Sequence, residues 1–184
     1  MLFYLYKDVC YLYTFKYKQM KKLVCFPVLV LLLFVVSCQS DKKSDSYYDQ
    51  MNKKATAEEL LQRINLPIDK VAKKEKKKNL IEQDDDLLAY KYELSELDFY
   101  ELTYVFDELG CFEVGLDFQV NNKEQLGILK EAYTKQFNES KDFRLENDIN
   151  GLARWLKNDE SITVELDYAL QEDGILALTI FANE

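Results

Sequence analysis

The stretch "CFEVGLDFQV", residues 111–120, alternates apolar and polar side chains more regularly than any other part of the chain. Successive side chains of a β-strand point to opposite faces, so this period of two predicts a strand with one buried and one solvent-facing side. The predicted inward residues are Phe112, Val114, Leu116, Phe118 and Val120, and the predicted outward residues are Glu113, Asp117 and Gln119. Such a strand is typical of an antiparallel sheet with one wet face.

The same alternation continues on both sides of this stretch. Further strands are predicted at residues 87–94, 100–107, 152–157, 161–170 and 175–182. Turn residues separate most of them, including Asn150-Gly151 and Glu172-Asp173-Gly174. Tight turns join antiparallel neighbours, so the pattern predicts an antiparallel sheet of about six strands.

Two helices are predicted beside this sheet. A short one over 57–65 begins with a capping box of Thr56 and Glu59 and is limited by Pro67. A long one over 121–140 has a buried stripe of Leu126, Leu129, Tyr133 and Phe137 at helical spacing. Gly127 in this helix suggests close contact with the sheet. The predicted fold is therefore a two-layer α+β domain, with one short and one long helix on one face of the sheet.

The N-terminal part has a different composition. Residues 23–37 form an uncharged run of fifteen residues behind Met20-Lys21-Lys22. A membrane-spanning helix needs about 20 apolar residues, whereas the apolar core of a secretion signal has roughly 7–15. The run ends at Val35-Val36-Ser37-Cys38. This motif resembles the lipobox of bacterial lipoprotein precursors, with Val36 standing where Ala or Ser is commoner.

This resemblance implies a lipid anchor at Cys38. In that family the peptide is cut before the cysteine, and both its thiol and its new N-terminus are acylated. Gln39 in place of an Asp favours the outer membrane within that family. The alternatives are a short anchor helix or an ordinary secretion signal. The domain prediction is an overcalled start (1–19), a signal peptide (20–37), a lipidated flexible tether (38–56) and one α+β domain (57–184) with a charged connector (70–86).

Composition excludes several kinds of chemistry. The chain has no histidine and only five glycines, all isolated, which argues against the usual catalytic triads, most zinc sites and phosphate-binding glycine loops. The formal net charge of −9 argues against binding to nucleic acid, because that binding depends on basic side chains that contact phosphate. Residues 87–184 hold eight basic and 21 acidic side chains, so the acidic excess lies in the predicted domain. Cys111 is expected to be a small buried apolar residue. No cofactor is expected.

Five candidate binding residues lie on the predicted wet face of the sheet, namely Glu101, Glu113, Asp117, Glu165 and Asp167. Trp155, the only tryptophan, is a further candidate, but the alternation with Ala153 does not show which side of the sheet it faces. We expect a cell-envelope protein held to the membrane by its lipid, with this acidic face receiving a basic protein partner. A glycan site on Trp155 is the alternative, although the core is the more frequent place for such a residue. A hydrolase using Glu113 with Asp117, or Glu165 with Asp167, is a third hypothesis.

Overall fold

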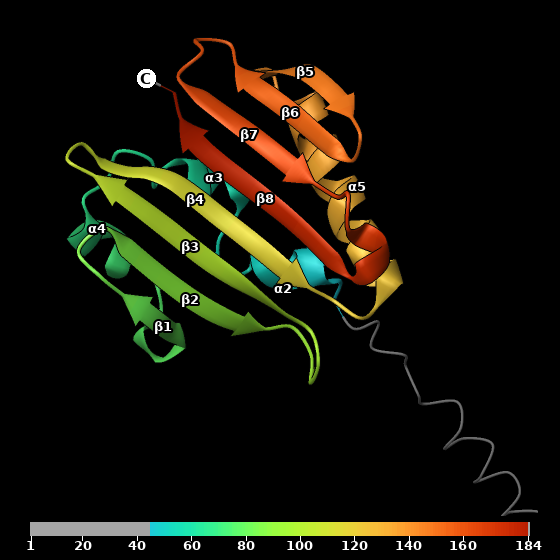
Figure 1. Ribbon diagram of the computed structural model, residues 1–184, viewed down its shortest axis with the longest axis horizontal. Coiled ribbons are helices and arrows are strands. Elements are labelled where there is room, and N and C mark those ends of the chain that lie inside the picture. The colour runs from blue at the N-terminus through green and yellow to red at the C-terminus, as the bar shows by residue number, and fades with distance from the viewer. Residues whose placement is uncertain (1–44, 184) are drawn as a thin grey trace, which may run out of the picture. The chain divides into compact units, whose positions relative to one another are not determined.

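The computed structural model describes residues 45–183, which form one eight-stranded antiparallel sheet with helices beside it (Figure 1). The strands are β1 (Leu80–Gln83), β2 (Leu87–Glu93), β3 (Phe99–Asp107), β4 (Gly110–Gln119), β5 (Phe143–Ile149), β6 (Leu152–Lys157), β7 (Ile162–Asp167) and β8 (Ile175–Ala182). Their order across the sheet is β1-β2-β3-β4-β8-β7-β6-β5. The architecture fits the expected α+β class, but the predicted number of about six strands is too low.

Two four-stranded meanders make up this sheet, and they meet at its centre. β4 pairs with β8 in antiparallel register, with Leu116 opposite Leu178. Helix α5 (Lys123–Glu139) carries the chain from β4 at the centre to β5 at the far edge (Figure 1). Each half of the domain therefore consists of a helical segment followed by four strands, which is one strand more per half than the sequence predicts.

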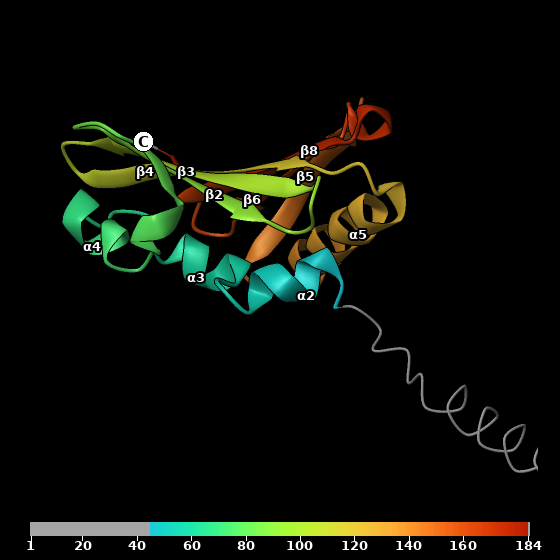
Figure 2. The ribbon, with the colours of Figure 1, turned by 90° about the horizontal axis from the view of Figure 1, so that it is seen from below.

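The α-helices all lie on one side of the sheet, as Figure 2 shows edge-on. They are α2 (Tyr47–Asn52), α3 (Ala57–Leu61), α4 (Ile68–Ala72) and α5. The described residues also form two short 3-10 turns, η1 (Lys77–Asn79) before β1 and η2 (Gln171–Asp173) before β8. The buried side of α5 consists of Leu126, Leu129, Tyr133 and Phe137, as predicted. Asn122 caps this helix by accepting a hydrogen bond from the Gln125 amide. No helix among residues 45–183 is long and apolar enough to cross a membrane.

Strand β4 follows the predicted alternation except at its first residues. A bulge shifts the register so that Val105 faces Glu113 while Phe106 faces Cys111. Phe112 is consequently the extra residue and is only half-buried, whereas Cys111 is 1% exposed. The inward placement of Phe112 is therefore wrong. Cys111 is the small buried residue that the sequence predicts, and its burial raises the pKa of its thiol to about 12.

Helix α3 is shorter than predicted. Its capping box is present, with Thr56 and Glu59 in their predicted roles. The helix ends at Leu61 rather than 65 because the chain then turns through Asn65, at φ 66°, to pair with the start of β4. The Asn65 amide donates to the Cys111 carbonyl at 2.8 Å, and the Cys111 amide donates to the Leu66 carbonyl at 2.9 Å.

Two segments predicted to be irregular belong to the fold. Within the tether predicted over 38–56, residues 47–52 form α2, which buries Tyr47 and Met51. The Tyr47 hydroxyl donates to Asp98 at 2.6 Å, which ties this helix to the β2–β3 turn. Within the charged connector predicted over 70–86, the chain forms most of α4, the turn η1 and the edge strand β1. Both segments therefore contain more regular secondary structure than the sequence predicts.

The absence of contact at Gly127 gives a stability prediction. An added Cβ at this position meets no heavy atom within 4 Å, so the expected close contact with the sheet is wrong. We expect Gly127→Ala to raise the free energy of unfolding by about 1 kcal/mol, because alanine loses less backbone entropy in a helix. Urea denaturation measures this difference, and an unchanged or lower midpoint contradicts it.

Gly110 provides a control for that measurement, because alanine there is expected to change stability in the opposite direction. Its φ of +125° favours glycine, and a Cβ there lies 2.8 Å from the Asn65 carbonyl group. Gly110→Ala is therefore expected to lower stability while Gly127→Ala raises it.

Candidate functional site

The side of the sheet that carries no α-helix, called here the open face, holds the predicted acidic residues. Alternation with buried neighbours and the strand register place the following residues on it: Lys91, Glu101, Thr103, Val105, Glu113, Gly115, Asp117, Leu152, Arg154, Leu156, Thr163, Glu165, Asp167, Ala177, Thr179 and Phe181. All five predicted carboxylates therefore lie on one surface. They come from three strands, β3, β4 and β7.

Two of the five carboxylates have basic partners on neighbouring strands. Arg154 lies opposite Glu165 in the β6–β7 register, and its Nε donates to Glu165 Oε1 at 2.6 Å. Lys91 lies opposite Glu101 in the β2–β3 register, with 3.8 Å between Nζ and Oε1. Such partly exposed pairs contribute little to stability, but they reduce the negative charge of Glu101 and Glu165.

The other three carboxylates have no basic partner within residues 45–183. Asp167 accepts a hydrogen bond from the Ala169 amide at 2.9 Å and so shapes the turn after β7. Glu113 lies on the open face opposite Phe181. Asp117 lies opposite Glu101, and the pKa of Asp117 is raised by loss of solvent and by this neighbouring carboxylate. A positive group arriving at Asp117 would therefore relieve an existing repulsion.

Small residues occupy the centre of the open face. Gly115 lies between Thr103 on β3 and Thr179 on β8 in the strand register. A Cβ added at Gly115 would meet no atom closer than 3.9 Å, the distance to both the Thr103 Cβ and Asp117 Oδ2. Val105 and Phe181 add half-buried apolar surface beside it. A surface that combines small residues, apolar surface and carboxylates suits contact with another protein.

The carboxylate pairs named for hydrolysis each lie along one strand of the open face. Glu113 and Asp117 are four residues apart on β4, and Glu165 and Asp167 are two residues apart on β7. In the other pair, Glu165 is already bound by Arg154. Neither pair lines either of the two hollows described below.

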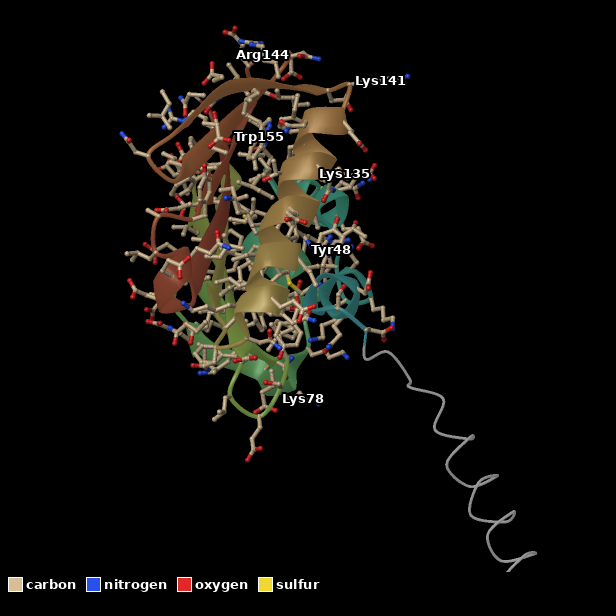
Figure 3. All side chains as sticks on the ribbon, turned by 90° about the vertical axis from the view of Figure 1, so that its right-hand side faces the viewer. Tyr48, Lys78, Lys135, Lys141, Arg144 and Trp155 are labelled. Carbon is tan, nitrogen blue, oxygen red and sulfur yellow. The ribbon has the colours of Figure 1, made fainter. Side chains whose placement is uncertain are left out.

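Trp155 lies in the core and not on a surface. Figure 3 shows it between the sheet and α5. Its side chain is fully buried, its ring centroid lies 5.5 Å from that of Phe137, and its Nε1 donates to Asn138 at 2.8 Å. The preferred core position of Trp155 is therefore confirmed, its alternative role as a surface binding residue is wrong, and the glycan hypothesis loses the ring on which it depended.

Two hollows lie outside the centre of the open face. The first, of about 1040 Å³, is lined by Asp84, Asp85, Asp86, Asp107 and Glu108 with Gln83 and Phe106. Within residues 45–183 no group of three or more ligand residues is placed to hold a metal ion. The second, of about 490 Å³, is lined by Lys54, Lys76, Lys78, Asn79, Ile81, Lys91, Tyr92 and Glu93, and is called here the lysine hollow.

Sequence reasoning missed the lysine hollow. Its signal is the basic run between Lys70 and Lys78, which we interpreted as a solvated connector. The missing element is Lys54, which was assigned to the tether but follows α2 and lies over the Tyr92 ring.

Comparison with known proteins adds no relative. No family model matches the chain, and it has no match among the curated proteins or among the solved structures. A functional proposal for this chain therefore depends on the geometry and electrostatics of its own surfaces.

Proposed function

We propose that this chain is a lipid-anchored cell-envelope protein whose open face binds a basic protein partner. The observation that carries the proposal is the one-sided arrangement of the sheet (Figure 2), in which every α-helix of residues 45–183 lies on the side opposite the open face. Protein interfaces combine apolar contact with a polar rim, and the open face offers both. Its acidic side chains favour a partner of opposite charge.

The lipid anchor is the part of the proposal that depends on the sequence motif. Cys38 and the signal-like segment 20–37 lie outside the described residues. Acylation of Cys38 would hold the chain at a membrane, because two or more acyl chains give stable anchoring. Mass spectrometry of the protein purified from bacterial membranes tests this directly. A polypeptide that retains residues 20–37, or a Cys38 thiol without lipid, contradicts it.

Site-specific photo-crosslinking tests the open face. A photoreactive residue at Thr179 is expected to give a discrete adduct with another protein in intact cells, because Thr179 lies at the centre of the open face. The same probe at Lys135, an exposed position on α5, is expected to give none (Figure 3). Adducts of equal yield from both positions would contradict the proposal.

Charge reversal tests the electrostatic part of the interaction. Combining Glu113→Lys with Asp117→Lys is expected to reduce the Thr179 adduct by tenfold or more, because like charges then meet a basic partner. Glu131→Lys combined with Glu139→Lys is the matched control, since both residues are exposed on α5 and the change in net charge is identical. A similar loss in both double variants indicates a general charge effect and not binding at the open face.

A further inference from the structure

The lysine hollow concentrates positive charge in a predominantly acidic protein. Lys54 follows α2, Lys76 and Lys78 belong to the segment around η1, and Lys91 comes from β2. They come from three separate segments of the sequence, and the fold brings them to one hollow of about 490 Å³ at the β1–β2 edge of the sheet. Glu93 is the one carboxylate that lines it.

Three of these lysines have no carboxylate partner among residues 45–183. The contrast with their neighbours is direct, because Lys53 pairs with Asp45 and Lys73 pairs with Asp69. No such ion pair involves Lys54, Lys76 or Lys78 within the described part of the chain. The hollow therefore holds more positive than negative charge.

Glu75, which precedes Lys76 in the sequence, is already bound by hydroxyl groups. Glu75 accepts a hydrogen bond from Tyr92 at 2.5 Å and another from Tyr104 at 2.8 Å. These two bonds direct its oxygens into the space between the sheet and the helices. Glu75 is therefore held by the tyrosines instead of pairing with the adjacent Lys76.

Aromatic rings hold Lys54 in position. Its Nζ lies 4.9 Å from the centroid of Tyr92 and 5.3 Å from that of Tyr100, and the two rings stack at 5.0 Å. The pKa of Lys54 is lowered, first by loss of solvent and then by the charge of Lys76. An anion between Lys54 and Lys76 would replace this repulsion with attraction.

We propose that the lysine hollow binds an anion bearing a phosphate group. Lysine ammonium groups bind phosphate as point charges, and several converging lysines make charge-assisted hydrogen bonds to its oxygens. The Asn79 side chain lines the same hollow and provides a neutral amide. The phosphate can come from a lipid headgroup or from a soluble phosphate ester, because both present the same group.

Lysine acetylation measured by mass spectrometry tests this site in the full chain. In neutral detergent, glycerol phosphate at constant ionic strength is expected to slow acetylation of Lys54 at least fivefold in a saturable manner. Chloride at the same ionic strength is not expected to protect it. Lys135 is the control, because it lies on α5 in a different part of the domain from Lys78 (Figure 3).

Variants identify the residues that hold the phosphate. Lys76→Gln and Lys78→Gln are each expected to raise the concentration needed for protection of Lys54 about tenfold, since each removes a charged hydrogen-bond donor. Lys135→Gln is expected to leave it unchanged. All three positions are exposed, so circular dichroism should show the same fold for each variant.

Vesicles distinguish the two sources of phosphate. Protection of Lys54 in phosphatidylglycerol vesicles but not in phosphatidylcholine vesicles supports an anionic lipid headgroup as ligand. Protection by glycerol phosphate without protection in either vesicle supports a soluble phosphate ester. Failure of every phosphate compound to protect Lys54, or equal protection of Lys135, overturns the site.

Discussion

Replacing Trp155 with alanine is expected to lower the free energy of unfolding by about 3–5 kcal/mol. Its ring is fully buried between β6 and α5, where it packs against Phe137. Truncation therefore leaves a cavity and also leaves Asn138 without the indole Nε1 donor. Urea denaturation followed by far-ultraviolet circular dichroism measures the loss without depending on the missing tryptophan.

Two conservative variants separate packing from hydrogen bonding at this position. Trp155→Phe keeps much of the apolar volume and is expected to cost less than alanine. Asn138→Ala removes the hydrogen-bond acceptor while leaving the ring, and is expected to cost about 1–3 kcal/mol. An alanine variant at position 155 that is as stable as the wild type contradicts a core role for the tryptophan.

The strands with one buried and one wet face could be predicted from the sequence. The inward sets of β2 and β3, such as Tyr90 and Tyr104, are buried as the alternation predicts. The stripe of α5 is confirmed for the same reason. In each case burial of one face requires apolar residues at the period of the element, so the pattern records the contact.

The edge strands could not be predicted in this way. β1 and β5 bury no residue fully, and their exposed positions include Ile81, Leu145 and Ile149. Neither face of these two edge strands is buried, so their sequences carry little alternation. The Asn150-Gly151 turn was nevertheless a signal for β5, because a two-residue turn of this kind joins two strands.

The site was only partly predictable because ion pairs depend on register. Alternation places the five carboxylates on the open face, but it does not reveal which of them have partners. Arg154 reaches Glu165 only because β6 and β7 pair in the observed register. Lys54 likewise reaches Tyr92 only because α2 packs on the domain. Long-range pairing of this kind leaves no local mark in the sequence.

Alkaline conditions are expected to unfold the domain steeply. Burial raises the pKa of tyrosine hydroxyls most strongly at four positions, Tyr92, Tyr100, Tyr104 and Tyr133, and Glu75 raises the first three further. A raised pKa in the folded state means that the unfolded chain releases its proton first. Stability is therefore complete below the unfolded pKa of about 10 and falls as pH rises above it.

The expected size of this effect follows from the number of buried groups. Each contributes about 1.4 kcal/mol per pH unit, so four tyrosines give about 5 kcal/mol per pH unit above pH 10. The Cys111 thiol, with a pKa of about 12, begins a smaller decline near pH 8.5, the value for a free thiol. A domain stability of about 5–15 kcal/mol is then exhausted within one to three pH units.

Ultraviolet absorbance of tyrosinate, recorded together with circular dichroism, measures this transition. The buried tyrosines are expected to ionise only as the secondary structure is lost, in a single cooperative step. Tyr92→Phe removes one of the four groups and is expected to reduce the pH slope by about a quarter, while also removing a hydrogen bond to Glu75. If all the tyrosines ionise near pH 10 while the circular dichroism stays constant, the side chains between the sheet and helices are not enclosed as the structure places them.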